Sequence, residues 1–418
     1  MILQQPCSNA KGANSSNKLY NLLEDKEESI FCLFLRKRFF SFKKKYREED
    51  FNIMKKRLVV LSTALSLTIG LAGCNSTENT ANTTQPPTEQ AENNNQSQEL
   101  IDFAIGHLPT TGHSLYYIAQ EEGYFKEEGL NATFHPFSNS GEGINAVIAG
   151  KLDVGTFGTP APLTFEEQGA DIVFLGGQMG TGAGVVSKPN LLHELQDINN
   201  FKGKKVATVK LATGDVILRG ALYEAGIDYE KDVTIIEMNS PADVIMAVKK
   251  GEVDAGVVWA PFVEKAKQEG LEIVKYSQEY AENHVCCRII ADEKRFDENH
   301  EKYVKFLKAI IKAERFEKDE ANKQKAIEDI KKYVDVDLEI IEKDIYGGYV
   351  DQSADPNKKA ILSMRDTMVN IGYLKEEKDI SDLIHVETYK EALDQLIAAE
   401  PNDPFYQELL VRFQENNL

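Results

Sequence analysis

The 418-residue sequence predicts an α/β protein whose folded part is two-lobed, with each lobe a mainly parallel sheet flanked by helices and a C-terminal helical region on lobe one. Two observations predict this class. Strand-like and helix-like segments alternate from residue 100 onward, which implies parallel strands with helices on both faces of the sheet. A stretch in the first half also recurs, without a gap, 101 positions later. This recurrence indicates two related lobes.

The first lobe begins with segments that are each bounded by a turn or helix-ending signal. IDFAIGHLP alternates apolar and polar residues and then meets a proline, which predicts a strand and a loop. HSLYYIAQEEGYF places Leu115, Ile118 and Ala119 on one face, as an amphipathic helix does. ATFHPF predicts a second strand, GEGINAVIAGK a helix that ends at Gly150, and DVGTFGTPAP a third strand running into another helix.

The internal repeat predicts a second lobe of the same design. AVIAGKLDVGTFGTP, residues 146–160, aligns with AVKKGEVDAGVVWAP, residues 247–261. Shorter echoes lie upstream in the same order, including Asn139–Ser140 with Asn239–Ser240. In open parallel sheets the carboxyl ends of the strands form the ligand crevice. Two such lobes enclose a cleft with helix N-termini on both walls, and these termini suit anionic or polar groups.

We place lobe one at residues 100–187, lobe two at 188–284, and the return to lobe one with the C-terminal helices at 285–418. The chain leaves lobe one through DIVFLGGQMGTGAGVVSKP and returns through EIVKYSQEYAENHVCCRIIADE. Two crossings between lobes permit hinge closure around a ligand. From Asp297 onward the sequence is strongly helical, and we expect this region to pack on lobe one with its charges on a solvated face.

The front of the chain has the features of an exported protein. Residues 54–73 begin with a basic cluster and continue through an uncharged run, as a signal peptide does, and Cys74 follows. Residues 74–99 are polar and free of aromatic residues, so they predict a disordered tether. Because a signal peptide normally lies at the very N-terminus, we interpret residues 1–53 as a mis-assigned extension. A genuine cytoplasmic extension is the alternative.

Charge and cysteine content exclude several classes of protein. Residues 1–74 hold 13 of the 48 Lys and Arg and 7 of the 67 Asp and Glu, so the part after Cys74 has a net charge of −25 (35 minus 60). This leaves no basic field for phosphates, and we expect no nucleic-acid partner. Past Cys74 only Cys286 and Cys287 remain, too few for a disulfide framework. The sequence shows no zinc-protease or P-loop motif, and we expect no metal, no cofactor and a monomer.

Several motifs together resemble the extracytoplasmic solute-binding proteins of the nitrate/sulfonate/taurine type, which are related to thiamin-pyrimidine-precursor-binding proteins. They are GYFKEEGLNATF, GINAVIAGKLDVGTFGTPAP, FKGKKVATVKLATGDV and VTIIEMNSPADVIMAVKKGEVDAGVVWAPF. The resemblance implies a two-lobed periplasmic-binding-protein fold of the second type (type II). It also implies delivery of a small solute to an ABC permease and its ATPase. Leu71-Ala72-Gly73-Cys74 resembles a lipobox, which implies acylation of Cys74 and a location on the extracytoplasmic face of the cell membrane.

The loops after the strands of lobe one supply the first candidate ligand contacts. His107, Thr111 and His113 lie in or beside the loop after the first strand, and the resemblance implies that this loop lines the cleft. Ser138 precedes a helix and Thr159 follows a strand end, where hydroxyl and backbone N–H groups are available. His113 and Ser138 also suit a purely structural role as caps of the helices that follow them.

Lobe two and the crossings supply the other candidates. Thr213 and Asp215 occupy the matching loop, where Asp215 either caps its helix or faces a donor group of the ligand. Trp259, the only tryptophan, lies at a strand end and suits an aromatic wall for a flat or apolar ligand. Gln178 lies in the glycine-rich outward crossing. Arg288, in the return crossing, is a natural partner for a carboxylate, sulfonate or phosphate.

The adjacent Cys286 and Cys287 leave two interpretations open, small apolar residues of a buried strand or a strained vicinal disulfide. With one histidine nearby they fall short of a structural zinc set. The sequence predicts a lipid-anchored solute receptor of an ABC importer with no enzymatic activity, for an anionic or heterocyclic organic solute. One alternative is an enzyme resembling thiamin-pyrimidine synthases that uses His113 and the cysteine pair. The other is an envelope sensor or scaffold that has lost transport.

Overall fold

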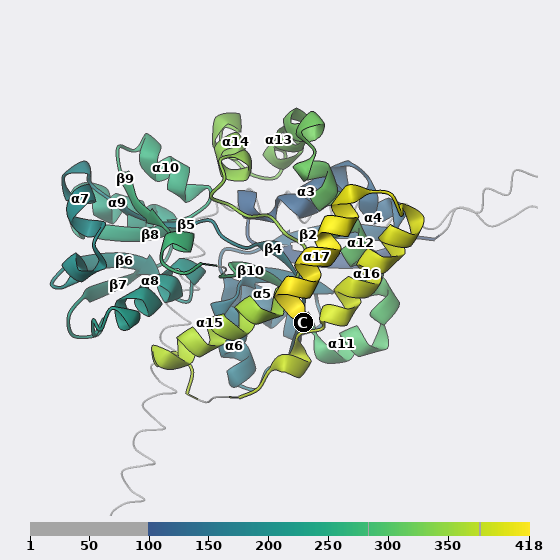
Figure 1. The fold of residues 1–418 in the computed structure, drawn as a ribbon, viewed down its shortest axis with the longest axis horizontal. Helices are drawn as coiled ribbons and strands as arrows, with labels where there is room; N and C mark the ends of the chain where they lie inside the picture. Colours follow the sequence, from purple (N-terminus) through teal and green to yellow (C-terminus); the bar gives the residue numbers. More distant parts are fainter. Residues whose placement is uncertain (1–98, 283, 376–377) are drawn as a thin grey trace, which may run out of the picture. The chain divides into compact units, whose positions relative to one another are not determined.

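The structure is a computed structural model that describes residues 99–282, 284–375 and 378–418 (Figure 1). The predictions for residues 1–53, the signal peptide at 54–73, Cys74 and all of the tether except Glu99 lie outside the described residues. Within the described part of the chain, no helix combines the length and the apolar character that crossing a bilayer requires.

The first sheet has five strands in the order β2-β1-β3-β10-β4. Strand β1 pairs in parallel with both β2 and β3, whereas β10 runs antiparallel to its neighbours β3 and β4. One strand of five is therefore reversed, and the sheet is mainly parallel, as predicted. The strands are β1 (Ile101–His107), β2 (Leu130–Pro136), β3 (Val154–Gly158), β4 (Ile172–Met179) and β10 (Cys287–Asp292).

The second sheet repeats this arrangement in the order β7-β6-β8-β5-β9. Strand β6 pairs in parallel with β7 and β8, and β5 is the reversed strand between β8 and β9. The strands are β5 (Ala183–Ser187), β6 (Lys205–Val209), β7 (Thr234–Met238), β8 (Ala255–Trp259) and β9 (Glu272–Tyr276).

The strand Ala183–Ser187 corrects the outward boundary at residue 187. It was assigned to lobe one, but it pairs along its whole length with β8, from Ala183 opposite Trp259 to Ser187 opposite Ala255. The chain therefore crosses between the sheets at residues 180–182, immediately after β4. Each lobe thus receives its reversed strand directly after a crossing, because β10 likewise follows the return crossing.

Each lobe contains the same pair of backbone and side-chain hydrogen bonds, at positions 101 residues apart in the sequence. The amide N–H of Ala104 donates to Oδ2 of Asp153 at 2.7 Å, and the N–H of Lys205 donates to Oδ2 of Asp254 at 2.8 Å. In each pair the aspartate N–H donates back to the carbonyl oxygen of its partner at 2.8 Å. Each aspartate therefore locks the start of its third strand to its first strand, and the repeat seen in the sequence is a repeat of structure.

Helices cover both faces of each sheet. The first lobe contains η1 (Thr111–His113), α3 (Ser114–Glu121), α4 (Tyr124–Glu127), α5 (Ser140–Ile148) and α6 (Pro160–Glu167). The second contains η2 (Pro189–Leu191), α7 (Leu192–Leu195), η3 (Ile198–Phe201), α8 (Thr213–Glu224), α9 (Pro241–Lys250), α10 (Phe262–Gln268) and η4 (Ser277–Glu279).

Local sequence explains the helix ends, and α9 is a clear case. Ser240 precedes the helix and its side chain accepts from the N–H of Asp243, while Pro241 occupies the first helical position. Lys249 and Lys250 lie in the last turn, where the helix dipole favours positive charge. Gly251 ends the helix with a φ of 75°, a conformation that glycine adopts without strain.

The C-terminal helices enclose the first sheet. They are α11 (Glu293–Glu298), α12 (His300–Lys318), η5 (Glu320–Asn322), α13 (Lys323–Lys331), α14 (Leu338–Tyr346), α15 (Lys358–Asn370), η6 (Ser381–Leu383), α16 (Val386–Ala399) and α17 (Pro404–Asn417). The ring of Phe306 on α12 stacks on Phe103 of β1 with centroids 4.8 Å apart. Neighbouring strand residues Ile289 and Ile290 belong to different apolar clusters, one on each face of the sheet.

The C-terminal region also reaches lobe two. The hydroxyl of Tyr373, just after α15, donates to Oδ2 of Asp215 on α8 at 2.7 Å. Side chains of α15 share an apolar cluster with Val216 and Ile217 of α8. The prediction that this region packs on lobe one is confirmed, and α15 adds a contact between the lobes.

Candidate ligand-binding cleft

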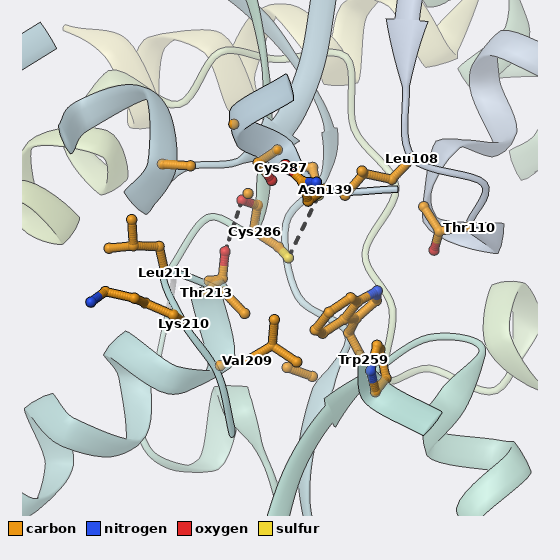
Figure 2. Close-up of a pocket in the computed structure, with 18 of the residues that line it drawn as sticks. Leu108, Thr110, Asn139, Val209, Lys210, Leu211, Thr213, Trp259, Cys286 and Cys287 are labelled. Atoms are coloured by element: carbon orange, nitrogen blue, oxygen red, sulfur yellow. Dashed lines mark hydrogen bonds between the residues drawn. The ribbon is translucent and has the colours of Figure 1, made fainter. Parts of the chain in front are cut away.

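A cavity of about 240 Å³ lies between the two sheets, with residues of both lobes in its wall (Figure 2). Strand ends, helix starts and the return crossing supply the lining. The lining residues are Leu108, Thr110, Ser138, Asn139, Ser140, Gly141, Gly158, Ala161, Phe165, Met179, Ala183, Val209, Lys210, Leu211, Ala212, Thr213, Gly214, Asn239, Ser240, Pro241, Trp259, Cys286 and Cys287. We call this space the cavity.

Three helices begin at the wall of the cavity. Helix α5 of lobe one starts beside Asn139, and α8 and α9 of lobe two start beside Thr213 and Ser240. Asn139 and Ser240 each cap their helix through a side-chain oxygen, whereas Ala212 before α8 offers no side-chain acceptor. The N–H groups of the first turn of a helix have no partner within the helix and carry partial positive charge. The cavity therefore favours a negative or strongly polar group.

The remaining wall is largely apolar. Trp259 at the end of β8 and Phe165 on α6 supply aromatic surface. Leu108, Val209 and Leu211 add aliphatic surface from the loops after β1 and β6. The indole of Trp259 packs edge to face against Phe262, with ring centroids 6.3 Å apart. Such a wall suits the carbon skeleton of an organic ligand.

Lys210 is the one residue with a formally charged side chain among the lining residues that the structure describes. Its Nζ lies 3.6 Å from Oε2 of Glu237, and its side chain is 64% exposed. Its amine points away from Trp259 in Figure 2, so Lys210 contributes a positive charge at the exposed edge of the cavity. In Figure 2 the lysine is drawn beside Leu211.

The cysteine pair forms part of the wall and anchors both lobes. The carbonyl oxygen of Cys286 accepts from the N–H of Thr159 at 2.7 Å and from its Oγ1 at 2.9 Å. It also accepts from Oγ1 of Thr213, in the first turn of α8, at 3.1 Å, drawn as a dashed line in Figure 2. Cys286 Sγ and Cys287 Sγ lie 3.7 Å apart, and both thiols are free. One carbonyl of the return crossing thus joins α6 of lobe one to α8 of lobe two.

Three of the ten predicted ligand contacts line the cavity, namely Ser138, Thr213 and Trp259. Thr159 does not, because its hydroxyl is turned to the carbonyl of Cys286. Ser138 does not cap α5; the cap is the next residue, Asn139. The three lining residues come from a helix start or a strand end, and their contact with a ligand stays a prediction.

Three predicted ligand contacts, His107, Thr111 and His113, are buried in and beside η1 of lobe one. Oγ1 of Thr111 donates to Oδ2 of Asp344 at 2.7 Å, and Nδ1 of His107 lies 3.2 Å from the hydroxyl of Tyr117. His113 is fully buried, and burial lowers its pKa to about 3, so it is neutral at physiological pH. None of these three is a lining residue, although Leu108 and Thr110 of the same loop do line the cavity.

Gln178, Asp215 and Arg288 also lie away from the cavity wall. Gln178 is fully buried in β4. Oδ1 of Asp215 accepts from Nε of Arg219 at 2.8 Å, so this carboxylate is neutralised within α8. Arg288 is 1% exposed, and its Nη1 donates to the carbonyl oxygen of Cys287 at 2.9 Å. Burial lowers the pKa of this guanidinium, against the opposing charge of Asp355.

Asn239, Ser240 and Lys210 also line the cavity, although they were not among the predicted ligand contacts. The internal repeat contained the signal for the first two. Asn139–Ser140 and Asn239–Ser240 occupy equivalent positions in the two lobes, and both pairs stand in the wall. Gly158 and Trp259 are likewise equivalent, at an offset of 101, and face the same cavity. Within the described ranges, no group of three or more His, Cys, Asp or Glu side chains is placed to hold a metal ion.

Known proteins share both the sequence pattern and the fold. A candidate aliphatic-sulfonate-binding protein of Bacillus subtilis is 25% identical over 366 residues, which cover 82% of this chain and 98% of that protein. The aliphatic sulphonate-binding protein SsuA of Escherichia coli superposes with a TM-score of 0.59 at 18% identity, over 69% of this chain and 99% of SsuA. The nitrate-binding protein NrtA of Synechocystis gives a TM-score of 0.62 at 18% identity, over 72% and 91%.

These likenesses confirm the two-lobed periplasmic-binding-protein fold. The model of the NMT1-like family matches residues 96–331, which is more than half of the chain. The resemblance to solute-binding proteins of the nitrate/sulfonate/taurine type is thereby confirmed, and the chain belongs to the NMT1-like family.

Proposed function

We propose that this chain is the solute-binding component of an ABC importer, and that it captures a small organic anion between its two lobes. The family membership supports the class of protein, and the cavity supports the class of ligand. The protein would release its solute to a membrane permease that is driven by an ATPase.

One observation carries the choice of an anion. Three helix N-termini converge on the cavity from both lobes, and the charged side chain that joins them in the described wall is Lys210. Helix starts bind carboxylate, sulfonate and phosphate groups through backbone N–H donors. A cation at this place would meet partial positive charge from three directions.

The apolar wall supports an organic solute over a bare inorganic ion. Trp259 and Phe165 offer aromatic surface that a nitrate or bicarbonate ion would leave largely uncovered. The volume of about 240 Å³ lies below the range of roughly 300–1,000 Å³ that accommodates drug-sized molecules. We therefore propose a compact acid whose anionic group meets the helix starts and whose carbon skeleton lies against Trp259.

Capture is proposed to work by closure of the cleft. Thr110 of lobe one and Ala260 of lobe two are already hydrogen-bonded beside the cavity, so the lobes are engaged. Opening breaks this bond and admits solute; closure remakes it and removes the solute from water. We further propose that Cys74 carries the lipid anchor and that residues 74–99 tether the domain at the extracytoplasmic face of the membrane.

A ligand screen tests the proposal. Purified protein is heated with aliphatic and aromatic sulfonates, small carboxylates, nitrate, bicarbonate and thiamin precursors, and the shift in melting temperature is measured. A solute that binds the folded state raises this temperature by mass action. We expect a hit among the organic anions that Trp259→Ala abolishes, with Tyr223→Ala, an exposed residue on α8, as the matched control. A folded protein that responds to cationic or neutral solutes and to no anion would overturn the proposal.

A further inference from the structure

Cys286 and Cys287 lie in the wall of the cavity, and the pair has a chemistry that solute binding does not use. Both side chains are buried, at 5% and 4% exposure, and the cavity is lined by both. Their sulfur atoms are 3.7 Å apart, and both thiols are free. A small reagent that enters the cavity therefore meets a wall to which both cysteines contribute.

We propose that Cys286 and Cys287 form a reversible modification site, a dithiol that closes to a vicinal disulfide and thereby weakens solute binding. The inference rests on the proposed function for its extracytoplasmic setting, where thiols are oxidised more readily than in the cytosol. The formation of the disulfide can be measured without any solute.

Geometry makes the disulfide reversible. Adjacent Cα atoms are about 3.8 Å apart across a trans peptide, whereas disulfides usually join Cα atoms about 4.4–6.8 Å apart. Closing the ring between neighbours therefore strains the chain, and a strained disulfide is more easily reduced. The pair is suited to switching and not to permanent cross-linking.

The same ring closure acts on the contact between the lobes. The peptide that joins the two cysteines is part of the ring, so its plane must rotate when the sulfur atoms bond. Its carbonyl oxygen, on Cys286, accepts from Thr159 of lobe one and from Oγ1 of Thr213 of lobe two. Rotation withdraws this acceptor from Thr213, and the first turn of α8 loses its link to the return crossing. Because that turn forms part of the cavity wall, oxidation alters the solute site.

The reaction balances with a small disulfide, RSSR, as the oxidant. The hydrogen bond from Cys287 lowers the pKa of Cys286, which makes Cys286 the attacking thiolate. Its sulfur bonds to one sulfur of RSSR, and RS⁻ leaves and takes up the proton. The thiol of Cys287 then loses its proton, attacks Sγ of Cys286 and releases the second RS⁻. Two S–H bonds are lost, one S–S bond forms, and RSSR is reduced to two RSH.

The first arm of the test follows the cysteines directly. Full-length protein is equilibrated with 2-mercaptoethanol and its disulfide, a small reagent pair, at graded ratios, blocked with an alkylating reagent and digested with trypsin. The peptide spanning residues 276–288 carries both cysteines and none of the other three. We expect this peptide to lose two hydrogens and both alkylation sites at high disulfide, and to recover them with dithiothreitol. A peptide that stays fully alkylated, or carries only mercaptoethanol adducts, would overturn the proposal.

The second arm measures the coupling to the cavity. A solute found in the screen is titrated into reduced and oxidised protein, and we expect oxidation to weaken binding about fivefold, the factor that one hydrogen bond of about 1 kcal/mol is worth. Thr213→Val should bind equally in both redox states, because its hydrogen bond is already absent, whereas Thr213→Ser should keep the difference. The Cys286→Ala/Cys287→Ala variant should bind the solute with the same affinity before and after treatment with the oxidant. Equal affinity in both states of the unmodified protein would overturn the coupling.

The two proposals fail differently. If no solute binds in either redox state, the proposed function fails, while the peptide still decides whether the disulfide forms. In that case the fluorescence of Trp259, the only tryptophan, reports the coupling without a solute. We expect its emission to change on oxidation in the unmodified protein and not in the double alanine variant. An unchanged emission with a formed disulfide would overturn the coupling.

Discussion

Thr110, in the loop after β1, donates a hydrogen bond of 2.6 Å from its Oγ1 to the carbonyl oxygen of Ala260, just after β8. The two residues belong to different lobes, and Thr110 lines the cavity. The same hydroxyl accepts from the N–H of Gly112 at 3.2 Å, which fixes its orientation. The bond therefore joins the two lobes directly beside the cavity.

Removing this hydrogen bond between Thr110 and Ala260 should speed the release of solute. Thr110→Val deletes the hydroxyl, and we expect the dissociation rate to rise about fivefold, in line with a net value of about 1 kcal/mol for a hydrogen bond. Stopped-flow measurement of dissociation checks this expectation. Thr110→Ser keeps the hydroxyl and should release solute at nearly the unmodified rate. Equal rates in the valine and serine variants would show that the bond does not hold the cleft.

Trp259 should supply much of the binding energy for the carbon skeleton of the solute. We expect Trp259→Ala to weaken binding by about 2 kcal/mol, roughly thirtyfold, because burying a large apolar side chain is worth about 1.5–3 kcal/mol. Calorimetric titration gives the value. Trp259→Phe keeps an aromatic face and should lose less. If alanine and phenylalanine bind as tightly as tryptophan, the solute does not lie against this wall.

Lys210 should make binding dependent on salt. Lys210→Gln removes the positive charge at the cavity, and we expect affinity for an anion to fall up to about fivefold at low salt, the range of exposed ion pairs, and less at high salt. Glu237→Gln frees Lys210 from its neighbour at 3.6 Å and should act in the opposite direction. Dissociation constants of both variants and the unmodified protein, measured at two ionic strengths, test these expectations. A loss of affinity in both variants would contradict an electrostatic role for Lys210.

Asp344 should make stability fall as pH rises through the neutral range. Burial raises its pKa from 3.8 to about 7, although Tyr349 and Thr111 bond to the carboxylate. Between these two pKa values the folded chain holds a proton that the unfolded chain releases. The stabilisation that this group contributes is therefore fully present below about pH 4 and is lost as the pH rises towards 7. Over this range the free energy of unfolding falls by up to about 1.4 kcal/mol per pH unit.

Asp344→Asn should remove this dependence. The asparagine needs no proton to stay neutral, so we expect the variant to gain stability relative to the unmodified protein as pH rises from 4 to 8. Urea denaturation at a series of pH values measures the difference. Asp382→Asn, at an exposed position, serves as the control. A stability difference between Asp344→Asn and the unmodified protein that is independent of pH would contradict the account.

Much of the fold was predictable because its signals are local and repeated. The internal repeat at an offset of 101 residues predicted both lobes. Asp153 and Asp254 make equivalent hydrogen bonds, so the repeat preserves a structural contact as well as a sequence pattern. The boundary at residue 187 was wrong because the sequence of a strand beside a crossing does not reveal which of the two sheets the strand joins. Only the pairing of Ala183–Ser187 with β8 assigns that strand to lobe two.

The site was predictable only in part, for a related reason. Ser138, Thr213 and Trp259 were placed by the rule that strand ends and helix starts face the crevice, and they line it. Asp215 and Arg288 were chosen for their charge, but charge does not reveal whether a side chain already has a partner. Arg219 neutralises Asp215, and Arg288 is buried against the carbonyl of Cys287. Such partners come from the tertiary structure.

The most direct test of the central claim is a titration of the protein with small organic anions, followed by the fluorescence of Trp259. Because Trp259 is the only tryptophan and lies in the cavity wall, its emission reports binding at this place. We predict a saturable change for at least one organic anion, with the dissociation constant that calorimetry gives for the same solute. Calorimetric binding of an anion with no change in Trp259 emission would contradict a solute site between the lobes.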